Sequence, residues 1–220
     1  VNAGIDKEVC LNSSITFNDV TQTGGVAPII YKWNNPSTLN NINILKPIAS
    51  PTDAGTSSIT YTITVTDAKS CSATDDIILT VNPLPTVDAG TNKEVCLNDT
   101  VQLTGTAGGG TGSLNYLWNN TSTLNNSSII TPNAMPTNPL APSIIYTVTV
   151  TDQKNCTATD NTTLTVNSLP VTSNITGSTT TPACNANGIT YSVTATAGSS
   201  YAWTVPSDAT ITSGATGPNN

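Results

Sequence analysis

The sequence predicts an all-β protein built from tandem antiparallel sandwich domains. First, the chain repeats itself after about 85 residues, which is the size of a complete small domain. Second, apolar and polar residues alternate along short segments, a period of two that is typical of strands. Third, 42 Thr, 26 Asn and 21 Ser supply most of the polarity, and these residues suit strand faces and turns rather than helices.

Three stretches of the first copy return in the second with few changes. They are Val1–Asn12 as Val87–Asn98, Tyr31–Asn41 as Tyr116–Asn126, and Tyr61–Cys71 as Tyr146–Cys156. Arrays of near-identical domains usually provide length, spacing or repeated contact. The repetition therefore indicates a mechanical role and names no substrate.

The strands of the first copy can be followed in chain order by their alternation. Segments beginning near Ile15 and Ile29 come first, and the second of these brings Tyr31 and Trp33 onto one face. Residues 59–65 then alternate apolar side chains with Thr, and residues 73–81 continue the pattern after a turn at Asp67. About seven short strands with an early tryptophan indicate an antiparallel sandwich of immunoglobulin type.

The cysteines recur at matching places. Cys10 and Cys71 in the first copy correspond to Cys96 and Cys156 in the second. One pair in each repeat predicts an intradomain disulfide, Cys10–Cys71 and Cys96–Cys156, near one end of the sandwich, and hence an oxidising extracellular compartment. The alternative is a metal site, but the chain has no His and no Cys-x-x-Cys, which disfavours zinc.

Two short proline-containing linkers set the expected domain boundaries. Asn82–Thr86 and Asn167–Val171 divide the chain into residues 1–84, 85–169 and 170–220. Proline favours an extended, semi-rigid connection over flexible coil. The last segment contains Tyr201 and Trp203 but ends before a second cysteine could follow, so we expect an incomplete third domain with Cys184 unpaired. The alternative is completion by a strand from another subunit.

The charge balance disfavours several classes of partner. The net charge is −7, with six Lys and no Arg, which disfavours nucleic acid and anionic membrane surfaces. No apolar run approaches the roughly 20 residues of a membrane span. We expect the partners to be neighbouring domains of the same long chain, with surface glycans or further copies in a fibre as additional candidates.

The repeated motifs resemble the PKD-like repeats of very large bacterial surface proteins. They are the opening that ends in Lys-Glu-Val-Cys-Leu-Asn, the Tyr-x-Trp segment, and Tyr-Thr-Val-Thr-Val-Thr-Asp followed by a cysteine. Such repeats are similar to those of gliding-motility adhesins and other cargo of type IX secretion. The residues after the tryptophan, Asn34-Asn35-Pro36 and Asn119-Asn120-Thr121, depart from the PKD signature, so contacts of that loop are not carried over.

The tryptophans and aspartates are the candidates for ligand contact. Trp33, Trp118 and Trp203 follow a core-like tyrosine by two residues, which predicts burial in the core rather than a sugar-stacking platform. We expect no cofactor. The alternative is calcium, held by one of two carboxylate sets. The sets are Asp6, Asp67 and Asp75 in the first copy, and Asp88, Asp152 and Asp160 in the second.

Catalysis is not expected, because the chain has no His and no Ser or Thr beside a plausible base. Thr100 lies in Asp99-Thr100-Val101, which fits an acceptor pattern for bacterial O-glycans and makes it a candidate by resemblance. The alternative is a plain strand hydroxyl.

The resulting hypothesis is a non-enzymatic stalk or fibre segment of a large extracellular bacterial surface protein. It would act as a rigid spacer and could take part in adhesion. The competing hypothesis is a set of accessory domains, glycan-binding or spacing, of a secreted multidomain hydrolase.

Overall fold

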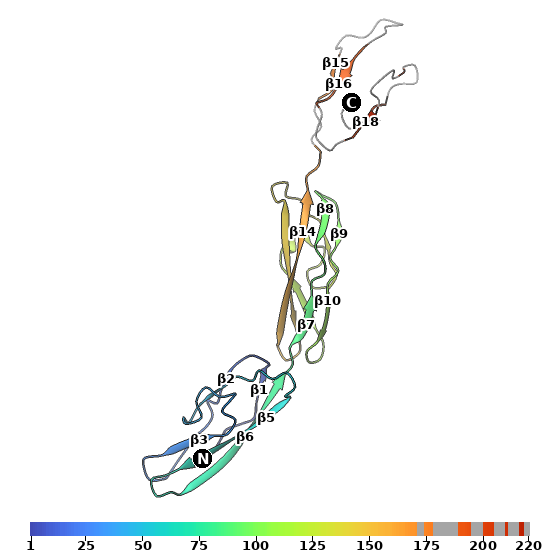
Figure 1. Ribbon diagram of the computed structural model, residues 1–220. Helices are drawn as coiled ribbons and strands as arrows, with labels where there is room; N and C mark the ends of the chain where they lie inside the picture. The colour runs from blue at the N-terminus through green and yellow to red at the C-terminus, as the bar shows by residue number, and fades with distance from the viewer. Residues whose placement is uncertain (171–173, 178–188, 195–199, 205–209, 211–215, 218–220) are drawn as a thin grey trace. The chain divides into compact units, whose positions relative to one another are not determined.

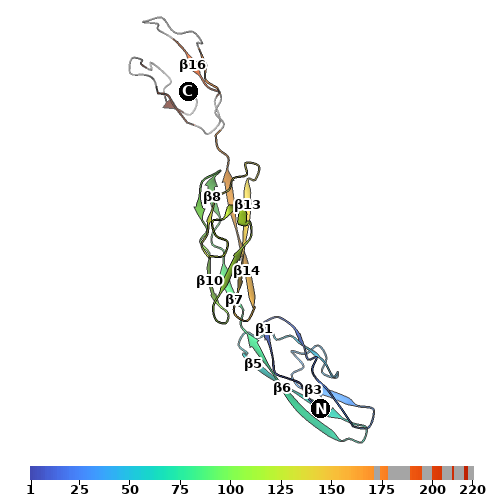
Figure 2. The same cartoon turned by 180° about the vertical axis from the view of Figure 1, so that it is seen from behind.

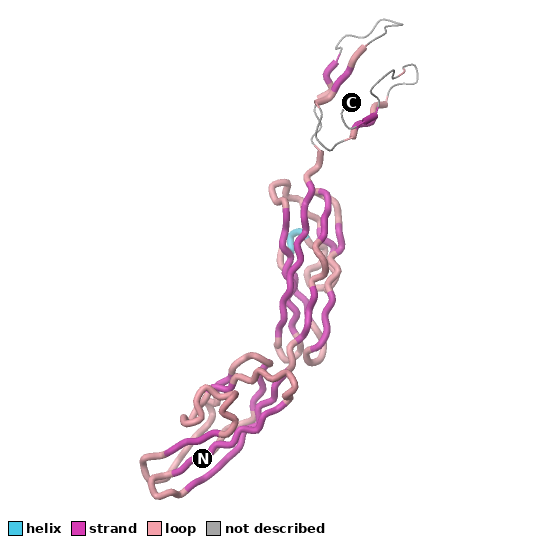
Figure 3. Tube along the Cα trace, viewed as in Figure 1, coloured by secondary structure: helices cyan, strands magenta, loops and turns pink. Residues whose placement is uncertain are grey.

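The computed structural model divides the chain into two compact units, Val1–Val166 and Asn167–Asn220 (Figure 1). It describes residues 1–170, 174–177, 189–194, 200–204, 210 and 216–217. Within these residues the regular structure is β apart from one 3₁₀ turn at Thr121–Thr123 (Figure 3). The predicted all-β class is confirmed.

The first repeat contains a four-stranded sheet in the order β1-β6-β5-β3 and a two-stranded sheet that pairs β2 with β4. The strands are β1 Lys7–Cys10, β2 Ile15–Thr16, β3 Ile30–Trp33, β4 Ile48–Ala49, β5 Ser58–Thr66 and β6 Ser72–Asn82. β5 and β6 form a long antiparallel hairpin, whose turn is closed by the pairing of Thr66 with Ser72. β1 runs parallel to β6 and pairs with its last four residues.

The second repeat has the corresponding large sheet in the order β11-β13-β14-β8, together with the pairs β10-β7 and β12-β9. Its strands are β7 Pro85–Asp88, β8 Lys93–Cys96, β9 Val101–Gln102, β10 Thr106–Gly109, β11 Asn115–Trp118, β12 Asn133–Ala134, β13 Ser143–Thr151 and β14 Thr157–Asn167. Both ribbon views show β13 and β14 side by side along this repeat (Figures 1 and 2).

The alternating pattern decides which faces of the long strands are buried. In β5, Tyr61, Ile63 and Val65 are buried while the threonines between them are partly exposed. β13 buries its side chains in the same way. Because successive strand residues point to opposite faces, each long strand contributes one continuous apolar strip to the core of its repeat.

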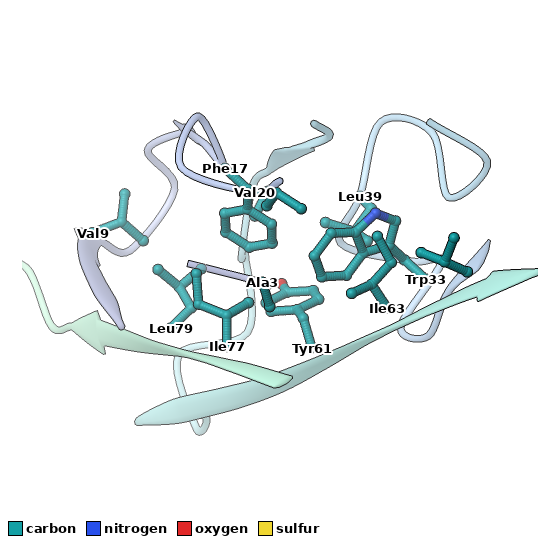
Figure 4. Packing of buried hydrophobic residues seen from close by; sticks show 12 residues of the cluster. Ala3, Val9, Phe17, Val20, Trp33, Leu39, Tyr61, Ile63, Ile77 and Leu79 are labelled. Carbon is teal, nitrogen blue, oxygen red and sulfur yellow. The ribbon is translucent and has the colours of Figure 1, made fainter. Parts of the chain in front are cut away.

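The core of the first repeat is centred on three aromatic rings (Figure 4). The Phe17 ring lies 5.5 Å from Trp33 and 5.2 Å from Tyr61, measured between centroids. The buried polar atoms are satisfied locally. Trp33 Nε1 donates to Ile44 O at 3.0 Å, and the hydroxyls of Tyr61 and Thr38 share a hydrogen bond of 2.7 Å.

The core of the second repeat keeps the same two hydrogen bonds and has a smaller apolar side chain at one position. Trp118 Nε1 donates to Ile129 O at 3.0 Å, and the hydroxyls of Tyr146 and Thr123 lie 2.7 Å apart. Leu103 is buried at the position where the first repeat has Phe17. The two repeats are therefore the same fold with one aromatic ring exchanged for an aliphatic side chain.

The second unit is described through two short antiparallel pairs. β15 Thr176–Gly177 pairs with β16 Tyr191–Ser192, and β17 Tyr201–Ala202 pairs with β18 Thr216–Gly217. Trp203 follows β17 and is partly buried, in contrast to the full burial of the other two tryptophans. Cys184, expected to be unpaired, lies outside the described residues.

Candidate functional site: the joint between the repeats

The predicted pairing of the cysteines is wrong. Cys10 of the first repeat forms a disulfide with Cys156 of the second, with 5.6 Å between their Cα atoms and a sequence separation of 146. Cys71 and Cys96 are free and exposed. The disulfide therefore joins neighbouring domains and does not close a loop within either one.

The geometry of β6 explains why the intradomain pairing fails. Cys10 lies opposite Asn82, the last residue of β6, whereas Cys71 directly precedes Ser72, its first residue. A strand of 11 residues spans about 35 Å at roughly 3.3 Å per residue. A disulfide requires its two Cα atoms within about 7 Å, so Cys10 and Cys71 stand at opposite ends of the domain.

The first side of the joint is the end of β1. The strand stops at Cys10, and the chain turns through Asn12, whose φ of 63° is in the left-handed region that Asn tolerates. The turn is fixed because Leu11 N donates to Asn82 O at 2.8 Å and Ser13 N donates to Cys10 O at 3.0 Å. Cys10 is consequently held at the end of the repeat where the chain leaves it.

The second side of the joint is the β13–β14 hairpin, which is organised around one carboxylate. Asp152 accepts hydrogen bonds from the backbone N–H groups of Thr111, Lys154 and Cys156, at 2.7 to 2.9 Å. Burial of Asp152 by itself opposes ionisation, but these three donors outweigh it and hold the pKa of the carboxyl below its usual value. Asp152 therefore fixes the backbone that carries Cys156.

An ion pair accompanies the disulfide across the joint. Lys154 Nζ lies 2.7 Å from Glu8 Oε2, and Asn82 Nδ2 donates to the same oxygen at 3.4 Å. These two hydrogen bonds, led by that of Lys154, lower the pKa of Glu8. The side chains of Lys154 and Glu8 remain 41% and 53% exposed, so the pair adds orientation and little stability.

The linker between the repeats is very short. Only Pro83 and Leu84 separate the end of β6 from the start of β7. The residues on either side of them, Asn82 and Pro85, are buried. Together with the disulfide and the ion pair, the linker gives the two repeats three connections at one place, which is a strong restraint on their relative motion.

The two candidate calcium sets do not form clusters. Each carboxylate instead caps backbone N–H groups: Asp75 accepts from Ala3, Asp6 from Ile78, Asp160 from Ala89 and Asp88 from Gly90, at 2.7 to 2.9 Å. Across the described part of the chain, no three His, Cys, Asp or Glu side chains gather as a metal site would require. These aspartates act as structural anchors.

The tryptophans of the first unit do not provide a sugar-stacking surface. Trp33 and Trp118 are 1% and 0% exposed, and their indole N–H groups are used inside the core. Thr100 lies exposed in the loop between β8 and β9, where a glycan could be accommodated, and its glycosylation stays a prediction. Among the described residues, no helix is long and apolar enough to cross a membrane.

Sequence reasoning found the four cysteines of the first two repeats but missed their partners, the ion pair and the role of Asp152. A usable signal was present. The first cysteine of each repeat precedes the early strands, the second follows a hairpin turn, and a long alternating strand separates that turn from the linker. That arrangement already places the two cysteines at opposite ends of one sandwich.

Comparison with known proteins places the modules in a recognised class. Residues 89–166 match the family model described as K319L-like, PKD domain, and residues 169–219 match the model described as PKD-like domain. No curated protein matches the chain.

Several solved structures are similar to the chain at a low level. The I-band fragment I67-I69 from titin is 16% identical, with a TM-score of 0.37 over 74% of this chain and 63% of that one. DIP-gamma IG1+IG2 is 8% identical, with a TM-score of 0.33 over 74% and 93%. The PKD domain from the KIAA 1837 protein is 24% identical, with a TM-score of 0.31 over 37% and 85%. These values carry no argument about function. By these family models, the chain contains two consecutive PKD-type domains, at residues 89–166 and 169–219.

Proposed function

We propose that the chain is a structural segment of an extracellular stalk, in which neighbouring repeats are locked together to hold a fixed spacing. The single observation that carries the proposal is the disulfide between Cys10 and Cys156, which joins two domains instead of stapling one. A flexible connector has no need of such a bond. A spacer that must resist bending or extension gains from it directly.

The disulfide also supports an extracellular location. Cystines persist in oxidising compartments and are rare where glutathione and thioredoxin keep thiols reduced. A low proportion of charged residues and many hydroxyl and amide side chains are compatible with exposure outside the cell. Within this proposal, the parent protein is a large bacterial surface adhesin of the gliding-motility type, exported by type IX secretion. The support for this finer identification is the resemblance of the repeated motifs.

The position of the disulfide protects most of both repeats from being extended under tension. Tension applied to the two ends of the chain would pass from residues 1–10 across the sulfur atoms to residues 156–220. The chain between the two cysteines, which have a sequence separation of 146, holds most of both repeats and would be excluded from the stretched path. At roughly 3.5 Å per extended residue, about 500 Å of chain would be protected from extension.

Single-molecule stretching of the full chain from both termini tests this function. We expect the oxidised protein to release about 500 Å less length than the reduced protein when both are fully extended. Cys71→Ser is the matched control, because this exposed, unbonded cysteine should leave the released length unchanged. Equal released lengths with and without reductant would contradict the proposal.

The competing function, glycan binding by accessory domains of a secreted hydrolase, receives no specific support from the geometry. Its most direct form needs an exposed aromatic strip, and Trp33 and Trp118 are buried. The proposal therefore assigns this segment no catalytic role and no cofactor. Its partners would be neighbouring domains and other copies of the same repeat.

A further inference from the structure

The repeat that forms one half of the joint also exposes the other half at its opposite end. The hairpin of the first repeat, with Lys69 and Cys71, corresponds to the hairpin that brings Lys154 and Cys156 into the joint. Cys71 is exposed, and Lys69 forms no ion pair within the described residues. This end therefore carries the thiol and the cation of a joint, and no strand among the described residues meets them.

The second repeat exposes that missing strand end. Lys93–Asn98 has the same six residues as Lys7–Asn12. It also has the same local structure. β8 ends at Cys96 as β1 ends at Cys10, and Asn98 has a φ of 70° where Asn12 has 63°. Cys96 is free and exposed. Glu94 is exposed as well.

The β5–β6 hairpin of the first repeat has the same hydrogen-bonding pattern as the β13–β14 hairpin, whose cysteine is bonded. Asp67 accepts from the backbone N–H groups of Val26, Lys69 and Cys71 at 2.9 to 3.1 Å, as Asp152 does from its three donors. Ser70 adopts a φ of 64° where Asn155 has 60°. The backbone that would present Cys71 is thus already in the bonded form.

We propose that Cys71 of one copy of this chain pairs with Cys96 of a second copy, forming a head-to-tail joint equivalent to Cys10–Cys156. Lys69 of the first copy meets Glu94 of the second, as Lys154 meets Glu8. The contact uses different surfaces on the two partners, so it does not close on itself and each added copy exposes a new pair of ends. The inference rests on the same kind of covalent joint that the proposed function uses.

The chemistry is thiol–disulfide exchange with a low-molecular-weight disulfide as oxidant. The Cys96 thiolate attacks one sulfur of the small disulfide, forming a mixed disulfide and expelling one small thiolate. The Cys71 thiolate of the other copy then attacks the Cys96 sulfur and expels the second small thiolate. Two protein thiols are oxidised, one small disulfide is reduced to two thiols, and the two protons released by the cysteines are taken up by the leaving thiolates.

Oxidation of the full chain in a glutathione redox buffer tests the joint. All variants carry Cys184→Ser, so that the fifth cysteine cannot react, and the wild-type chain is run beside them. We expect a ladder of covalent oligomers on non-reducing gels and a Cys71–Cys96 cross-linked peptide by mass spectrometry. Absence of oligomers, or a Cys96–Cys184 bond in the wild-type chain, overturns the proposal.

Two single variants test the head-to-tail direction. Cys71→Ser and Cys96→Ser should each remain monomeric alone, and their mixture should form dimers and nothing larger. Dimers of Cys71→Ser alone would show a symmetric Cys96–Cys96 bond and would overturn the proposal.

The ion pair provides a test that does not remove a thiol. Glu94→Lys should slow oligomer formation about threefold, and Lys69→Glu in the same chain should restore the rate. Asp76→Lys, which makes the same charge change at an exposed position in the middle of β6, is the matched control. If Asp76→Lys slows the reaction as much as Glu94→Lys, the proposed contact is wrong.

The two proposals fail separately. If peptide mapping finds the Cys10–Cys156 bond but no Cys71–Cys96 bond, the locked spacer stands and the joint between copies fails. If Cys10–Cys156 is absent as well, both fail.

Discussion

The β5–β6 hairpin of the first repeat and the β13–β14 hairpin of the second have nearly the same sequence and backbone but different surroundings. Asp152 and Cys156 are 2% and 1% exposed, whereas Asp67 is partly exposed and Cys71 is exposed. Both carboxylates accept three backbone N–H groups. The difference lies in the neighbouring domain, because the second hairpin meets the end of β1 and the first meets none among the described residues.

The comparison shows that the repeat unit of this chain is larger than one sandwich. A single domain supplies a cysteine at each end, and the one disulfide among the described residues joins two neighbouring domains. A search for paired cysteines within one domain therefore finds the right residues and the wrong bond.

The largest expected effect on stability is that of removing the disulfide, which only the second hairpin forms. In the chain-entropy treatment, a link that closes a loop of 146 residues contributes about 5 kcal/mol. We expect Cys10→Ser to lower the free energy of unfolding by about this amount. Cys71→Ser should leave it unchanged. Guanidinium titration followed by tryptophan fluorescence measures both variants, and equal effects would refute the assigned pairing.

Mutation of the core tryptophans should affect both repeats alike. Trp33→Ala and Trp118→Ala should each lower the free energy of unfolding by about 3–5 kcal/mol, since both rings are fully buried. Leu117→Ala, next to Trp118 but 59% exposed, is the matched control and should change it by less than about 0.5 kcal/mol. A clear inequality between the two tryptophan variants would mean that the exchange of Phe17 for Leu103 changes how much each tryptophan contributes to stability.

Loss of the hairpin carboxylate should lower the free energy of unfolding by less than loss of a core tryptophan. The effect should be larger in the second repeat than in the first. Asp152→Ala should cost about 1–3 kcal/mol, because the buried N–H of Cys156 and the partly buried N–H groups of Thr111 and Lys154 lose their acceptor. Asp67→Ala should cost less, because water can reach its donors. Amide hydrogen exchange at Cys156 and Cys71 measures the two effects locally. A larger increase over the wild-type exchange rate at Cys71 in Asp67→Ala than at Cys156 in Asp152→Ala would contradict this order.

The same two carboxylates should make stability depend on pH. In each, hydrogen bonds from the backbone lower the folded-state pKa, those of Val26 and Cys71 leading for Asp67 and those of Thr111 and Cys156 outweighing burial for Asp152. A lowered pKa gives stability that is fully present above the unfolded value of about 3.9 and is lost as pH falls through the folded value. The free energy of unfolding should therefore change less between pH 6 and pH 3 in the variant with both Asp67→Ala and Asp152→Ala than in the wild type. Chemical denaturation at the two pH values measures this difference.

Much of the fold could be predicted from residues alone. The alternation in residues 59–65 and 73–81 identified the long hairpin, and the buried tryptophans followed from their place on an apolar strand face. The small sheets and the parallel pairing of β1 with β6 were not predictable, because two-residue strands such as Ile15–Thr16 carry too short a pattern. The calcium sets assumed that the aspartates of each copy gather near an interdomain edge, whereas among the described residues they bond to separate backbone N–H groups and form no cluster of three.

The sequence by itself determined the class of the modules, their repetition and the identity of the cysteines, because alternation and duplication are local properties of a chain. The partner of each cysteine was decided by tertiary structure alone. Strand β6 carries the chain from one end of the first domain to the other, so that Cys10 is nearer to Cys156 of the next domain than to Cys71 of its own. Distance in space, and not spacing in sequence, selects which sulfur atoms bond.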